Sequence, residues 1–111
     1  MHELGLAEDV LKLLKEKAKD QGLLKLSYAK VAIGETLITD QPEFHELFSM
    51  ISAGSPAEGM KLEIEISPLK AVCSGCKKDF IPKDLRFDCP HCGSTDIKVA
   101  SGREIIIKEI R

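Results

Sequence analysis

Four cysteines near the C-terminal end of the chain have the residue type and the spacing of a metal site. They form two pairs, CSGC and CPHC, with twelve residues between the pairs. Each pair lets two thiolates reach one ion, and Gly75 and Gly93 suit the tight turns that such pairs require. Four sulfurs close a tetrahedral shell, which favours structural Zn²⁺ over a catalytic zinc with an open position. The predicted zinc ligands are Cys73, Cys76, Cys89 and Cys92.

The first three residues, Met1, His2 and Glu3, form a second group of potential metal ligands. Short covalent links join the α-amine of Met1 to the amide and imidazole nitrogens of His2. The amide nitrogen of Glu3 would complete a plane of four nitrogens, which suits Ni²⁺ or Cu²⁺ and does not suit Zn²⁺. The site requires a retained Met1, and the bulk of His2 favours retention. Spacing alone favours the simpler interpretation of an exposed His2, with Glu3 as an acidic residue at a helix N-terminus.

The other polar residues form no comparable group. We expect His45 and His91 to be exposed, with His91 as the internal candidate for an additional nickel ligand, and Asp40 to cap a helix. The hydroxyl residues have no base partner in the sequence, and there is no glycine-rich phosphate motif. The sequence therefore predicts a protein that binds metal and is not an enzyme.

Charge and hydropathy limit the partners and the compartment. A formal net charge of −2 and a pI of about 5.9 give no electrostatic footprint for nucleic acid or an anionic membrane. No run approaches the roughly 18 apolar residues of a membrane span, and the chain does not start like a signal peptide. We therefore expect a cytoplasmic protein, in which paired cysteines bind metal rather than form disulfides.

Two helices and three strands are predicted to carry these sites. Apolar residues at helical spacing, from Ala7 to Ala18, predict a first helix that stops at Gln21-Gly22. Asp40, followed by a proline and Glu43, predicts the start of a second helix with Phe44 on its buried face. Strands are predicted at residues 23–34, with a bulge near Ala29-Lys30, at 60–66 and at 103–111.

The predicted fold class is α+β, with two helices on one face of a three-stranded sheet and an inserted zinc-ribbon module that carries the four cysteines. Residues 1–69, completed by the C-terminal strand 103–111, would form the nickel-binding domain, and residues 70–102 the zinc-binding domain. The second unit has few apolar residues, so we expect it to depend on zinc for folding. Its expected small core consists of Phe80, Ile81, Phe87 and Ile97.

Taken together, these features resemble the HypA/HybF family of nickel-incorporation proteins for NiFe hydrogenase maturation. The resemblance lies in the initial MHEL, the two CxxC pairs and the SGRE that leads into the last strand, and it covers essentially the whole chain. One difference is Gly5, where the family commonly has serine.

The resemblance implies a nickel metallochaperone. It implies Ni²⁺ carried at Met1, His2 and Glu3, and structural Zn²⁺ at the four cysteines. It also implies a HypB-type GTPase as a partner and the NiFe hydrogenase large subunit as the recipient, with a homodimer as one state that the sequence allows. Two other hypotheses stay open from the residues alone: a zinc-ribbon adaptor that binds nucleic acid or a protein complex, and a rubredoxin-like electron carrier with iron at the four cysteines.

Overall fold

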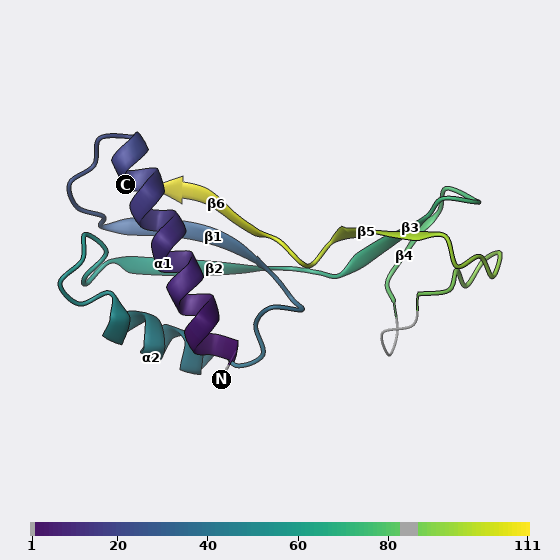
Figure 1. The fold of residues 1–111 in the computed structure, drawn as a ribbon, viewed down its shortest axis with the longest axis horizontal. Helices are drawn as coiled ribbons and strands as arrows, with labels where there is room; N and C mark the ends of the chain where they lie inside the picture. Colours follow the sequence, from purple (N-terminus) through teal and green to yellow (C-terminus); the bar gives the residue numbers. More distant parts are fainter. Residues whose placement is uncertain (1, 83–86) are drawn as a thin grey trace.

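The computed structural model describes residues 2–82 and 87–111, with the backbone alone for His2. The molecule is elongated, with extents of 52 × 29 × 16 Å. Both helices lie at one end and a small three-stranded ribbon lies at the other (Figure 1). In chain order the elements are α1 (His2–Asp20), β1 (Tyr28–Gly34), α2 (Gln41–Ile51), β2 (Lys61–Ser67), β3 (Lys70–Cys73), β4 (Asp79–Phe80), β5 (Ile97–Ser101) and β6 (Ile105–Ile110).

The first sheet has the strand order β2-β1-β6, and β1 pairs parallel with β2 and antiparallel with β6. Both helices pack on one of its faces (Figure 1). The central strand contributes Ala29, Val31 and Ile33 to the core, all with 0% exposure. The predicted α+β fold, with two helices on a three-stranded sheet, is confirmed.

The helix α1 already begins at His2, five residues before the first residue of its apolar repeat, Ala7. Val10 and Leu14 are fully buried on its inner face. The helix ends where predicted: Gly22 has a φ of +70°, and the N–H of Leu23 donates to the carbonyl oxygen of Ala18 at 2.8 Å. The left-handed glycine lets the chain leave the helix while the last carbonyl groups stay hydrogen bonded.

The strand predicted at residues 23–34 begins five residues later, at Tyr28. Leu24, inside the predicted strand, is 95% exposed. Leu26 is buried, but its N–H donates to the carbonyl oxygen of Pro56 at 2.8 Å and not to a neighbouring strand. The alternation in this segment therefore does not mark a strand.

The predicted bulge is present, but the extra residue belongs to β6. Lys30 pairs with Glu109 and Val31 pairs with Ile107, so Lys108 has no partner of its own in β1. A bulge of this kind shifts the phase of the side chains along the strand. It explains why Ile105, Ile107 and Ile110 all pack against the core although their spacing is irregular.

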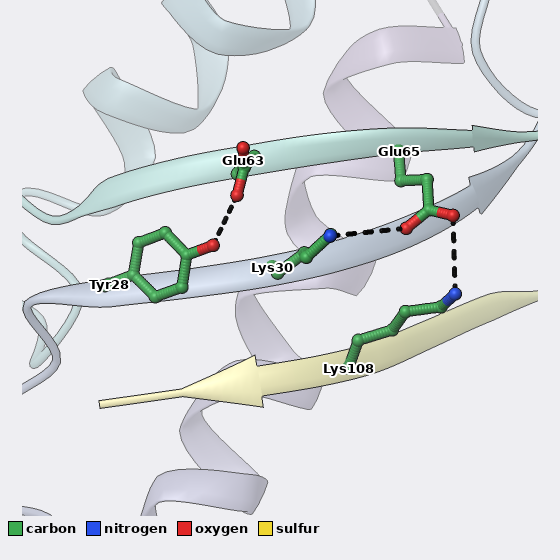
Figure 2. A network of polar contacts seen from close by, with 5 residues as sticks. All are labelled: Tyr28, Lys30, Glu63, Glu65 and Lys108. Atoms are coloured by element: carbon green, nitrogen blue, oxygen red, sulfur yellow. Dashed lines mark hydrogen bonds and ion pairs between the residues drawn. The ribbon is translucent and has the colours of Figure 1, made fainter.

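The other face of the first sheet carries no helix and is lined by charged and polar side chains (Figure 2). The Tyr28 hydroxyl donates to the Glu63 carboxylate on β2. Glu65 lies 3.9 Å from the ammonium group of Lys30 and 3.4 Å from that of Lys108. The residues of β2 alternate as the strand pattern predicts through Ile64, with Leu62 and Ile64 packed against the core, whereas Ile66 is 42% exposed.

Two continuous stretches of chain, β2 to β3 and β5 to β6, join the first sheet to the second. Gly102 has a φ of +103°, and a Cβ atom there would lie 2.4 Å from the Cα of Leu69. A Cβ on Gly34 would lie 2.3 Å from the carbonyl carbon of Gly102. The Thr36 hydroxyl also donates to the carbonyl oxygen of Gly102 at 2.6 Å. The backbone segments at Gly34, Leu69 and Gly102 are in direct contact here. The junction between the two sheets therefore requires glycine at positions 34 and 102.

The second sheet has the order β4-β3-β5, and the expected small core does not form in it. Ile81 is 64% exposed and Phe87 is 40% exposed, while Phe80 and Ile97 are only half-buried. The side chains buried in and beside this sheet are instead Leu69, Ala71, Cys73 and Cys89. Two of these four are predicted metal ligands, so the interior of the module is built around its cysteines. No helix in the part of the chain that the structure describes is long and apolar enough to cross a membrane.

Candidate metal sites

The four cysteines, which the sequence places in two separate pairs, meet in space. Their Sγ atoms all lie within 4.8 Å of one another, and no other group of metal-binding side chains of this size occurs among the described residues. The Sγ of Cys73 is 3.5 Å from that of Cys92, and the Sγ of Cys76 is 3.6 Å from that of Cys89. Four sulfurs about 2.3 Å from one tetrahedral Zn²⁺ lie about 3.8 Å from one another. The donor set and its dimensions therefore fit Zn²⁺.

Each cysteine pair forms a tight turn whose backbone N–H groups point at the first sulfur. The N–H of Cys76 approaches the Sγ of Cys73 at 3.5 Å, and the N–H of His91 approaches the Sγ of Cys89 at 3.3 Å. The fifth residue of each turn has a positive φ, and these residues are Lys77 (64°) and Gly93 (75°). Gly93 thus has the expected role, whereas the left-handed position of the first turn belongs to Lys77 and not to Gly75.

The pKa values of the cysteine thiols show how strongly the neighbouring sulfurs and backbone N–H groups influence one another's ionisation. The backbone N–H of Cys76 lowers the pKa of the Cys73 thiol to about 6. The pKa of the Cys92 thiol is raised to about 11: the backbone N–H of Ser94 favours its thiolate, but the neighbouring sulfur of Cys73 and burial outweigh that effect. Four thiolates this close repel one another, and a divalent cation among them removes that penalty.

The histidine between the last two cysteines is not part of this cluster. His91 is exposed, as predicted, and takes part through its backbone N–H alone. His45 was also expected to be exposed, but that prediction is wrong. It is half-buried, with its ring edge-on to Phe44 at a centroid distance of 5.8 Å and an interplanar angle of 80°.

At the N-terminal motif, Met1 and the side chain of His2 lie outside the described residues, and Glu3 is described in full. Glu3 is only 2% exposed, although it is charged. Its Oε1 accepts hydrogen bonds from the hydroxyl of Thr39 at 2.8 Å and from the backbone N–H of Thr39 at 3.3 Å. The Thr39 hydroxyl, more than the opposing effect of burial, holds the pKa of the Glu3 carboxyl below its usual range.

Thr39 is a residue that the sequence analysis did not single out. It lies 36 positions from Glu3 and directly before Asp40, with nothing in the local pattern to mark it. Asp40 itself is the predicted helix cap: it is the N-cap of α2, and its Oδ1 accepts the N–H of Glu43 at 3.0 Å. The connection between β1 and α2 thus begins beside the sheet junction and ends beside the first turn of α1.

The comparisons with known proteins agree with this arrangement of fold and cysteines. Residues 1–111 match the family described as "Hydrogenase/urease nickel incorporation, metallochaperone, hypA". The class of protein is therefore that of the nickel-incorporation metallochaperones. The chain belongs to the HypA family.

Individual relatives cover nearly the whole chain. The hydrogenase maturation factor HypA of Azotobacter chroococcum mcd 1 is 33% identical over 110 residues, which are 99% of this chain and 97% of that protein. The factor of the same name from Acidithiobacillus ferrooxidans is 34% identical over 113 residues, with the same coverage of both chains. The solution structure of the Ni metallochaperone HypA from Helicobacter pylori superposes with a TM-score of 0.74 at 25% identity, covering 99% of this chain and 96% of that one. The resemblance predicted from the sequence is confirmed.

Proposed function

We propose that this chain binds one Ni²⁺ at its N-terminus, through Met1, His2 and Glu3, and delivers it to the large subunit of a NiFe hydrogenase. The observation that carries the proposal is the match of the whole chain to a nickel-incorporation family, in a chain that begins with Met-His-Glu. Its relatives are named hydrogenase maturation factors, which supports a hydrogenase as the recipient.

The start of α1 supports a ligand set of nitrogens. The first four N–H groups of a helix have no acceptor within the helix, and α1 begins at His2. Using the amide nitrogens of His2 and Glu3 as ligands would therefore break no helical hydrogen bond. Together with the Met1 amine and the His2 imidazole they provide the four nitrogens that suit planar Ni²⁺. A site at the very end of the chain is open to solvent exchange, which suits a carrier that must release its cargo.

We further propose that Cys73, Cys76, Cys89 and Cys92 hold a structural Zn²⁺ in a domain of residues 70–102, separate from the nickel-binding domain of residues 1–69 and 103–111. Bound zinc would supply the cross-link that a unit with so little apolar interior lacks. The two candidate sites lie in different parts of the molecule, since α1 packs on the first sheet and β3 belongs to the second (Figure 1).

Delivery of nickel requires partner proteins, because the sequence has no motif for nucleotide hydrolysis. We propose that a HypB-type GTPase supplies nucleotide hydrolysis and that the exchange takes place in the cytoplasm, with the carrier as a monomer or a homodimer. The sequence has no glycine-rich phosphate motif of its own. Its net charge of −2 offers no argument for a nucleic acid partner.

The proposal is tested with untagged protein and with a variant that carries Gly-Ser ahead of Met1. The native chain should bind one Ni²⁺ with the absorption of a planar complex, and the extended chain should lose that binding while both keep one Zn²⁺. His2→Ala should have the same effect as the extension, with His45→Ala as the matched control. Equal nickel binding by native and extended chains would show that the terminal amine is not a ligand.

A further inference from the structure

The Glu3 carboxylate is a buried charged group that the nitrogen ligand set does not use. At 2% exposure it is one of the largest fully enclosed side chains of the protein, and its acceptor oxygens lie against the Thr39 hydroxyl and the backbone of Thr39 and Asp40. Burial of a carboxylate is unfavourable unless hydrogen bonds compensate it. The two bonds from the hydroxyl and the backbone N–H of Thr39 provide that compensation.

The residue that holds Glu3 is itself held in place on both sides. Ile38, directly before it, is 9% exposed and belongs to the main core. Asp40, directly after it, is the N-cap of α2. Thr39 therefore presents its hydroxyl from a well-fixed piece of backbone, and the bond to Glu3 connects the first turn of α1 to that backbone.

We infer that Thr39 is a positioning residue for the nickel site: it holds the Glu3 carboxylate away from the metal and fixes the first turn of α1, so that Glu3 offers Ni²⁺ its backbone nitrogen. This inference rests on the proposed function. It assigns the Glu3 side chain the role of an anchor, since only two methylene groups separate its carboxylate from the backbone that would bind the metal.

The alternative, a Glu3 carboxylate that binds nickel directly, carries a cost that the structure makes explicit. The carboxylate would have to leave its place against Thr39, and the two hydrogen bonds that offset its burial would be lost. An anchored first turn, by contrast, has its ligand atoms already in position when the metal arrives, and less ordering is left for the binding step.

Three single variants test this. Thr39→Val removes the hydroxyl and keeps the β-branched shape, whereas Thr39→Ser keeps the hydroxyl. Thr36→Val is the matched control, because it removes a hydroxyl from the same connection that bonds to Gly102 and not to Glu3. Nickel affinity, the absorption spectrum, zinc content and the unfolding temperature are measured on untagged protein for each. We expect Thr39→Val to weaken Ni²⁺ binding by about tenfold with an unchanged band position, and Thr39→Ser and Thr36→Val to keep the nickel affinity and spectrum of the native chain.

A nickel affinity of Thr39→Val equal to that of Thr36→Val would overturn the inference. Glu3→Gln provides a second test that does not depend on Thr39, because the glutamine amide oxygen still accepts the hydroxyl but is a poor metal ligand. An unchanged spectrum supports the anchor, and a shifted band would show that the carboxylate is a ligand. The native chain with and without the Gly-Ser extension reports on the terminal site alone. If that comparison fails, the inference fails with it, whereas a failure confined to Thr39→Val leaves the terminal site intact.

Discussion

The Sγ atoms of Cys73 and Cys92 lie 3.5 Å apart although 19 positions separate the two residues in the chain. Cys73 is the last residue of β3 and is fully buried. Cys92 is exposed and lies in the turn of the second cysteine pair. The Ser74 N–H beside the first turn donates to the carbonyl oxygen of Asp96 at 2.9 Å and β3 pairs with β5, whereas Ile81 and Phe87 stay exposed. The cysteine cluster thus adds a side-chain connection between the two turns to the backbone pairing of β3 and β5.

Zinc removal should therefore unfold the second sheet and spare the first. Structural zinc contributes on the order of 10–16 kcal/mol in small finger peptides, more than the half-buried side chains of this module can replace. After treatment with a chelator, hydrogen exchange should show lost protection for the amides of β3 and β5 and retained protection for β1. Cys73→Ser should reproduce the loss, with Ser74→Ala as its neighbour control. Retained protection of Val72 and Lys98, which pair across the two strands, would contradict the assigned role of zinc.

Gly5→Ala should stabilise the protein. Gly5 lies inside α1, where glycine is about 1 kcal/mol less favourable than alanine. A Cβ atom at this position would meet nothing within 4 Å. We expect an increase of about 1 kcal/mol in the free energy of unfolding, measured by urea denaturation, and unchanged zinc content.

Gly34→Ala provides the opposite case at the sheet junction. Its Cβ would lie 2.3 Å from the backbone of Gly102, which cannot yield as a flexible side chain would. Forcing an atom into a packed place costs about 1–3 kcal/mol, so the same denaturation experiment should show a loss of at least this size. A native-like stability for this variant would mean that the junction is looser than the described contacts indicate.

The stability should depend on pH through Glu104, which joins the ends of the two sheets. Its carboxylate accepts hydrogen bonds from the Ser67 hydroxyl at 2.9 Å and from the backbone N–H groups of Gly102 and Arg103, each at 3.0 Å. The Ser67 hydroxyl, followed by the Arg103 N–H, lowers the pKa of Glu104 from its usual value near 4.5. Because the folded-state pKa is the lower one, this stabilisation is complete above about pH 4.5 and is lost as the pH falls through the lowered value.

Glu104→Gln isolates that contribution. The variant should be less stable than the native chain at neutral pH, and the difference should shrink as the pH falls below about 4.5, because the native carboxylate is then neutralised too. Glu58→Gln, at an exposed position after α2, is the matched control for the loss of one negative charge. A stability difference between Glu104→Gln and the native chain that does not change with pH would show that the carboxylate charge is not what matters.

Local patterns in the sequence predicted the features that depend on local spacing. The cysteine pairs, the end of α1 at Gly22 and the cap at Asp40 each follow from neighbouring residues, and each is present in the structure. The contact between Glu3 and Thr39 could not be predicted in this way. It joins residues 36 positions apart, and each of them has an ordinary local explanation, one as a helix-start acid and the other as a loop residue.

Two of the errors concern apolar residues that the structure leaves exposed. Leu24 lies inside the predicted strand 23–34 and is 95% exposed, and Phe87, which was expected in the small core of the cysteine module, is 40% exposed. A small protein cannot cover all its apolar side chains, and a thin ribbon of three strands has no second layer against which they could pack. Composition alone does not show which of the apolar residues lack a partner.

The contrast between Leu14 and Leu24 makes this last point measurable. Leu14 is fully buried in the core between α1 and the first sheet, so Leu14→Ala removes buried methyl groups and leaves a cavity. It should lower the free energy of unfolding by about 2–5 kcal/mol. Leu24→Ala makes the same chemical change at a 95% exposed side chain and should alter stability by no more than about 0.5 kcal/mol. Urea denaturation of both variants with zinc bound checks the difference. A large loss for Leu24→Ala would mean that this leucine is covered in solution, for which a second copy of the chain, detected by sedimentation, is the first explanation to examine.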